Sequence, residues 1–172
     1  MPLITLQQQQ QFKPISLNNA LEYNQIETET VEKDLTELLG AAMVAALLKA
    51  PTSERMLNIL NEKEFEDTSG NTVIHKGLTS VLAYLIYARY IAGSSIKDTM
   101  TGLVKKNRQE SENVSDGAIR VLRQEARDVA VAKFQLVKEY LSMNSNTYPE
   151  WECGSNRRQF KPRMINLRKT YY

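Results

Sequence analysis

The sequence has one cysteine and one histidine among its 172 residues, and these shortages restrict its chemistry. Cys153 has no second cysteine with which to form an intramolecular disulfide. Because His75 is the only imidazole, the ligand sets of structural zinc sites are nearly excluded. Cys153 has no histidine nearby in sequence to activate it as a nucleophile, and the chain has no glycine-rich phosphate loop of the Walker or dinucleotide type. We therefore expect no enzymatic activity, no metal and no cofactor.

Membrane-spanning and targeting segments are also missing. The uncharged stretch 77–88 is followed by Arg89 and is shorter than the roughly 20 apolar residues that a transmembrane helix needs. The N-terminus has no basic region followed by an apolar core of signal-peptide length. We expect a soluble chain made in the cytosol, with no membrane partner.

Two polar features have ordinary interpretations. His75 ends a β-prone stretch, where a surface or packing role is the usual one. Glu62, Glu64, Glu66 and Asp67 fall in a turn-prone stretch, which favours a solvated acidic loop over a metal cluster.

What the sequence does contain is helical periodicity over most of its length. The apolar residues of 26–39 recur with a helical period, and Gly40 predicts the end of that helix. Two short helices are expected next, at 41–49 and at about 53–60. Ser115 predicts the cap of the longest helix, 116–143. Its expected apolar stripe consists of Ile119, Leu122, Ala126, Val129, Phe134, Val137 and Leu141.

The segment from Gly77 to about Gly93 is expected to form a helix that is apolar on more than one face. Leu78, Val81, Leu82 and Leu85 lie on one helical stripe, and Tyr84, Tyr87 and Ile91 lie on another. Such a helix must be buried on more than one side, so we expect it at the centre of the fold.

Two β-prone stretches flank this central helix. Residues 65–75 contain turn-forming residues from Asp67 to Asn71 and predict a small hairpin or an irregular loop. Residues 94–114 form the longest connection, with a β-prone part at 97–105 and basic residues that are candidates for facing a channel or a neighbouring subunit. These basic residues are Lys97, Lys105, Lys106 and Arg108.

The fold class that follows is mainly α: a small bundle of four to five helices, two of them long, with a small β-hairpin or loop element and extended arms at both ends. We assign residues 1–15 to an N-terminal arm, 16–143 to the helical body with its long loop 94–114, and 144–172 to a C-terminal arm. The glutamine-rich first arm is either flexible or ordered only against a neighbour. Two arms on a compact body suggest a subunit that assembles.

Basic charge is concentrated in the C-terminal arm. Residues 144–172 hold 6 basic and 2 acidic side chains, whereas residues 1–143 hold 16 basic and 18 acidic ones. Cationic and aromatic side chains together suit a groove of a partner protein, a solvated disordered tail or contact with nucleic acid. The candidate contact residues are Arg157, Arg158, Phe160, Lys161, Arg163, Arg168, Lys169, Tyr171 and Tyr172.

Several short motifs resemble a helical family of tailed-phage head–tail connector (adaptor) proteins. The resemblance covers 12–151 and is closest to versions carried by phages of Bacteroidetes, including crAss-like phages. The motifs are Phe12-Lys-Pro-Ile-Ser16-Leu-Asn18, Leu38-Leu39-Gly40, Lys76-Gly77-Leu78, Ala83-Tyr84, Tyr87-Ala88-Arg89-Tyr90, Thr101-Gly102-Leu103-Val104-Lys105, Ser111 to Ser115, Tyr140-Leu141 and Tyr148-Pro149-Glu150-Trp151.

This resemblance implies a structural virion protein of the phage neck, assembled in the host cytoplasm. Such a protein forms a ring, typically of twelve copies, that docks beneath the portal, extends the DNA channel and carries the next neck or tail component. DNA passes through the channel without sequence-specific contact, and the C-terminal arm can lie in a groove of the portal. The alternative from a different class is a helical nucleic-acid-binding module that uses its basic tail.

Overall fold

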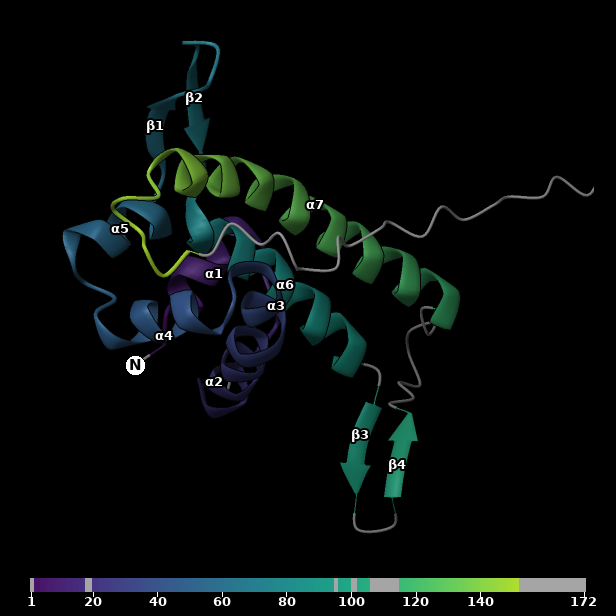
Figure 1. The fold of residues 1–172 in the computed structure, drawn as a ribbon. Helices are drawn as coiled ribbons and strands as arrows, with labels where there is room; N and C mark the ends of the chain where they lie inside the picture. The colour runs from purple at the N-terminus through teal and green to yellow at the C-terminus, as the bar shows by residue number, and fades with distance from the viewer. Residues whose placement is uncertain (1, 18–19, 95, 100–101, 106–114, 152–172) are drawn as a thin grey trace, which may run out of the picture.

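The computed structural model describes residues 2–17, 20–94, 96–99, 102–105 and 115–151, and they form a mainly helical fold (Figure 1). The predicted fold class, a mainly α protein with a small β-hairpin, is confirmed. The elements are α1 (Leu6–Phe12), α2 (Ala20–Glu29), the π-helix η1 (Thr30–Leu35), α3 (Thr36–Leu39), α4 (Ala41–Lys49), α5 (Glu54–Leu60), β1 (Lys63–Glu66), β2 (Thr72–His75), α6 (Gly77–Ser94), β3 (Ile96–Thr99), β4 (Gly102–Lys105) and α7 (Asp116–Met143).

Helix α6 lies at the centre of the fold and is buried on more than one face. Leu78, Leu82, Ala83 and Ile86 point in several directions around the helix and have no exposed surface. α7 runs along α6, as Figure 1 shows, and supplies one wall of the core. The sequence prediction of a central scaffold helix is therefore confirmed, and the pairing of α6 with α7 determines how the rest of the chain is arranged.

The start of α6 depends on a glycine. Gly77 has a φ of 75°, in the left-handed region, and a Cβ at this position would lie 2.2 Å from the carbonyl oxygen of Leu60. Thr79 also binds this carbonyl, since its hydroxyl donates to Leu60 O at 2.8 Å. The end of α5 and the first turn of α6 are thus in direct backbone contact, which leaves no space for a side chain.

Two antiparallel hairpins flank α6 in the chain. β1 pairs with β2 in the register Lys63↔His75 to Glu66↔Thr72. The Asp67 carboxylate accepts from the backbone N–H groups of Ser69 and Asn71, both at 2.8 Å, so the predicted turn is confirmed. β3 pairs with β4 inside the predicted long loop, in the register Ile96↔Lys105 to Thr99↔Gly102. This second hairpin lies away from the helical body in Figure 1.

The expectation of an extended N-terminal arm does not hold over Leu6–Phe12, which forms α1. Thr5 and Gln8 make a capping box, in which the Thr5 hydroxyl accepts from Gln8 N and the Gln8 side chain accepts from Thr5 N. Gln9 is fully buried and donates to the carbonyl of Ala83 in α6 at 3.0 Å. The glutamines are therefore part of a regular helix, and one of them, Gln9, is hydrogen-bonded to α6 in the core.

Helix α2 holds the first residues of the chain. The Glu27 carboxylate accepts from Leu3 N at 2.7 Å, and the Tyr23 hydroxyl donates to Ile4 O at 3.1 Å. Burial raises the pKa of Glu27, while hydrogen bonds from the backbone N–H groups of Leu3 and Ile4 lower it. Ile4 is itself fully buried, so the N-terminal segment is part of the body.

The segment after α7 also packs on the body, although it was assigned to the C-terminal arm from residue 144 onward. Both guanidinium nitrogens of Arg55 donate to the Glu150 carboxylate, at 3.0 and 2.9 Å. The Tyr148 hydroxyl donates to Arg55 O at 2.8 Å, and Trp151 is buried edge-on against Phe134. The body therefore extends to Trp151, the last residue described.

Candidate functional site

The candidate site is the exposed end of α7, defined here as residues 116–125, together with the neighbouring β3–β4 hairpin. Every residue from Asp116 to Glu125 is exposed or half-buried, whereas the C-terminal half of α7 buries a regular stripe against α6. In Figure 1 the N-terminal end of α7 lies at the opposite side of the molecule from α4 and α5. This end of the molecule therefore presents the beginning of a long helix to its surroundings.

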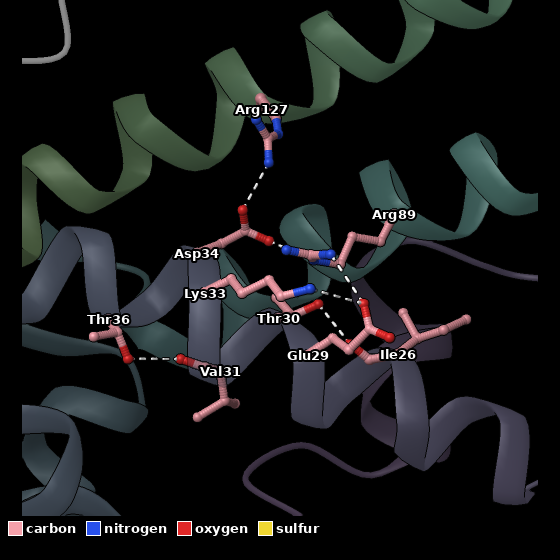
Figure 2. Close-up of polar contacts among 9 residues, drawn as sticks. All are labelled: Ile26, Glu29, Thr30, Val31, Lys33, Asp34, Thr36, Arg89 and Arg127. Carbon is pink, nitrogen blue, oxygen red and sulfur yellow. Dashed lines mark hydrogen bonds and ion pairs between the residues drawn. The ribbon is translucent and has the colours of Figure 1, made fainter. Parts of the chain in front are cut away.

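A cluster of charged side chains fixes the direction of α7. The Asp34 carboxylate accepts from Arg89 Nε at 2.6 Å and from Arg127 Nη2 at 2.7 Å, so it joins η1 to α6 and α7 (Figure 2). Glu29 adds a bond from Arg89 Nη1 at 3.2 Å and lies 3.8 Å from Lys33 Nζ. Because Arg127 comes two residues after the exposed end, this cluster holds the first turn of α7 that packs on the body.

The local geometry of η1 places Asp34 in this cluster. A π turn accommodates one more residue than an α turn, and here the hydroxyl of Thr36 donates to Val31 O at 3.0 Å. Thr30, Val31, Asp34 and Leu35 are all buried as a result. Asp34 thus sits beside apolar core residues, and the side chain is 10% exposed, which makes its two arginine partners necessary.

The exposed end of α7 carries apolar side chains that the described residues do not cover. Val121 is 57% exposed and Leu122 is 43% exposed. Val129, one turn into the supported part, is 38% exposed. Single exposed apolar residues are common on protein surfaces, but several along one helix indicate a contact surface.

The predicted apolar stripe of α7 is correct in its C-terminal part and wrong in its N-terminal part. Ala126, Phe134, Val137 and Leu141 are buried as predicted. Leu122 is exposed because α7 has 28 residues and its partner α6 has 18, whereas Val129 lies between buried Ala126 and Ala130 but on a neighbouring face of the helix. The N-terminal turns therefore have no helix of the same chain beside them, and helical periodicity alone contains no information on that difference in length.

Most of the site residues predicted from the sequence lie outside the described residues. These are Lys106 and Arg108 of the long loop and, in the C-terminal arm, Arg157, Arg158, Phe160, Lys161, Arg163, Arg168, Lys169, Tyr171 and Tyr172. Lys97 lies in β3 opposite Val104, and Lys105 lies in β4 opposite Ile96. The structure thus brings these two lysines into one hairpin, which follows the end of α6.

Sequence reasoning missed the Asp34 cluster. The available signal was the type of residue at each position: Asp34 lies three residues after Val31 and four before Leu38, at helical spacing with apolar residues, and Arg89 is the single charged residue between Gly77 and Ser94. A lone charge on a buried helix face requires a partner, and one acidic and one basic residue of this kind predict a pair.

His75 has a packing role. It is fully buried, and its ring lies 4.8 Å from that of Tyr140 and 5.9 Å from that of Phe65, measured between centroids. Its Nδ1 accepts from Gly77 N at 3.2 Å, while Nε2 has no hydrogen-bond partner among the described residues. Burial lowers the pKa of His75, and nearby Lys63 lowers it further against the opposing charge of Glu62.

Two other kinds of site were sought in the part of the chain that the structure describes. No group of three or more His, Cys, Asp or Glu side chains there is arranged to hold a metal ion. In the same part, no helix has the length and apolar character required to cross a bilayer.

One family of proteins matches this chain. The family of unknown function DUF6712 matches residues 35–161, which is about three quarters of the sequence and runs from the end of η1 past the end of α7. No curated protein and no solved structure shows a significant match.

Proposed function

We propose that this chain, which belongs to the DUF6712 family of unknown function, is a structural subunit of a tailed-phage neck. In this role it forms a ring beneath the portal, extends the DNA channel and carries the next neck or tail component. The proposal has two sources: the connector-like motifs between Phe12 and Trp151, and the uncovered apolar surface of α7. It assigns the protein no catalysis.

The observation that carries the proposal is the exposed apolar surface of α7. Leu122 and Val129 are apolar and substantially exposed, and in the sequence they lie on either side of Arg127, which is bound by Asp34. A surface of this composition suits contact with protein better than contact with a small ligand, since rigid apolar residues with charged neighbours are typical of interfaces. A closed ring of copies would cover such a surface on every subunit.

The test is electron microscopy of the purified protein mixed with the portal protein of the same phage. We expect rings, docked on the portal, that surround a channel. A matched sample truncated after Trp151 keeps the described body and lacks the basic C-terminal arm, so it should dock more weakly if that arm lies in a portal groove. If the full-length protein stays monomeric and no protein docks on the portal, the proposal fails.

A second candidate function follows from the charge of the C-terminal arm. With 6 basic and 2 acidic residues in 144–172, the arm could bind nucleic acid directly. That function predicts DNA binding that weakens steeply with salt and that is lost on truncation after Trp151. Fluorescence anisotropy with a labelled duplex at several salt concentrations separates it from the neck role, which needs no affinity for free DNA.

A further inference from the structure

A second apolar stripe runs along α7, beside the one that packs on α6. It consists of residues alternately three and four positions apart, the spacing at which two helices pack against each other. We call it the lateral stripe: Ala118, Leu122, Glu125, Val129, Ala132 and Leu136. All of these are exposed except Leu136, which is half-buried. The lateral stripe includes one charged residue, Glu125.

A shorter stripe of the same character lies on α4. Met43, Val44 and Leu47 bury one face of this helix in the core. The opposite face presents Ala41, Ala45 and Leu48, one helical turn apart, and we call these three residues the α4 stripe. Leu48 is 49% exposed, and small residues beside it would let another helix approach closely.

The two stripes cannot cover each other within one molecule. α4 and the N-terminal end of α7 lie on opposite sides of the body in Figure 1. When two complementary surfaces lie at different places on one chain, copies join head to tail, and a contact of this kind makes a ring when its rotation closes and a filament when it does not.

Charge also favours a second copy as the occupant. Glu125 lies within the lateral stripe, and Lys49 follows Leu48 at the end of α4. Among the described residues neither of them makes an ion pair, so each is available to the other across an interface. An anionic ligand such as DNA would meet Glu125 on this stripe, while Arg120 and Arg123 lie on another face of the helix.

We infer that the α4 stripe of one copy packs on the lateral stripe of the next, and that this contact builds the ring. The inference rests on the proposed neck function and adds the surfaces that join its subunits. A contact of a few helical turns is smaller than the roughly 800 Å² per partner of a stable pair. Closure of the ring, in which every copy uses both stripes, compensates for that small area.

Disulfide trapping tests the contact without requiring stable rings. On a Cys153→Ser background, Leu48→Cys is mixed under mild oxidation with Leu122→Cys or with Val129→Cys. Arg120→Cys is the control, because Arg120 is exposed and lies on the face of α7 opposite the lateral stripe. We expect at least about tenfold more dimer with one of the two stripe cysteines than with the control, since a disulfide needs Cα atoms within about 7 Å.

The outcomes separate the inference from the proposed function. Trapping no greater than in the Arg120→Cys control, or dimers from Leu122→Cys alone, overturns the head-to-tail contact. Electron microscopy of the same samples with the portal gives the second result. Rings without the specific disulfide support the neck function and overturn the contact. The specific disulfide without rings supports the contact and overturns the neck function.

Discussion

Gly77 is the residue on which the junction between α5 and α6 depends. Its φ is 75°, and a Cβ would meet the backbone of Leu60 and Asn61 at 2.2 to 2.6 Å. We expect Gly77→Ala to lower the free energy of unfolding by about 2–3 kcal/mol, because an L-residue is strained in this conformation and the two helices must also separate. Urea denaturation monitored by circular dichroism measures the change.

Gly93 in the same helix is the matched control. A Cβ there would have no atom within 4 Å, and the backbone is helical. Gly93→Ala should leave stability unchanged or raise it by up to about 1 kcal/mol, since alanine is the better helix former. Equal effects of the two substitutions would contradict the close contact at Gly77.

His75 should make stability depend on pH. Its folded pKa lies below the unfolded value of about 6.5, mainly because of burial, so the unfolded chain binds more protons at acidic pH. The free energy of unfolding should therefore fall as pH drops below about 6.5, with a slope of at most about 1.4 kcal/mol per pH unit. Urea midpoints between pH 5 and pH 8 give this slope.

The His75→Asn variant isolates the imidazole. Its amide oxygen can still accept from Gly77 N, but it does not titrate, so the acid slope should shrink even though overall stability falls. Glu27, whose pKa is raised, contributes with the opposite sign: its stabilisation is complete at low pH and is lost as pH rises through its folded pKa. Both proteins share that contribution, and an unchanged slope in the variant would rule out His75 as the source.

At the scale of elements, the Asp34 cluster connects three helices that are distant in sequence. Asp34→Asn removes the charge that Arg89 and Arg127 share, and an amide N–H group would face one of them. We expect the free energy of unfolding to fall by about 2–4 kcal/mol. This is at the lower side of the range for breaking a buried ion pair, because the arginine side chains are 21% and 30% exposed.

The control for this cluster is Glu29→Gln. The Glu29 side chain is 56% exposed and contacts Arg89 Nη1 and the exposed Lys33, so loss of its charge should change stability by less than about 0.5 kcal/mol. Thermal unfolding of both variants is the measurement. A loss in Asp34→Asn as small as in the control would mean that α7 is held by its apolar contacts alone.

Most elements could be predicted because each has its own local signal. The turn at Asp67, the helix end at Gly40 and the cap at Ser115 are set by residues within one turn of the chain. α1 was missed because a glutamine-rich segment with few apolar residues predicts an extended arm. The capping box of Thr5 and Gln8 was the local signal, and the contact of Gln9 with Ala83 is long-range and invisible to periodicity.

At the scale of the whole molecule, α7 should be divided into two parts with different stability. Its C-terminal half is packed on α6, whereas the exposed end has solvent around it. In the monomer, amide hydrogens of 120–125 should exchange at least about tenfold faster than those of 130–141, because local opening there breaks few contacts. Mass spectrometry of exchanged peptides measures this, and protection of 120–125 after assembly would locate the contact.

The candidate site could be predicted less well than the fold. Its helix was found from periodicity, but whether a predicted apolar residue such as Leu122 is buried depends on the length of the helix beside it. That length is a property of the whole molecule. The predicted basic residues of the C-terminal arm lie outside the described residues, so their role stays a prediction.

The π turn has a consequence for the phase of the helix that contains it. At about 100° per residue, a regular helix would place Leu35 and Leu39 some 120° and 160° around the axis from Tyr23. All three are buried, because the extra residue of η1 resets the angle by roughly one position. Deleting one residue from η1 would let a regular α-helix keep both halves in phase with the core, with Leu35 and Leu39 about 20° and 60° from Tyr23. A regular helix of the present length, by contrast, would match the core with only one of its halves.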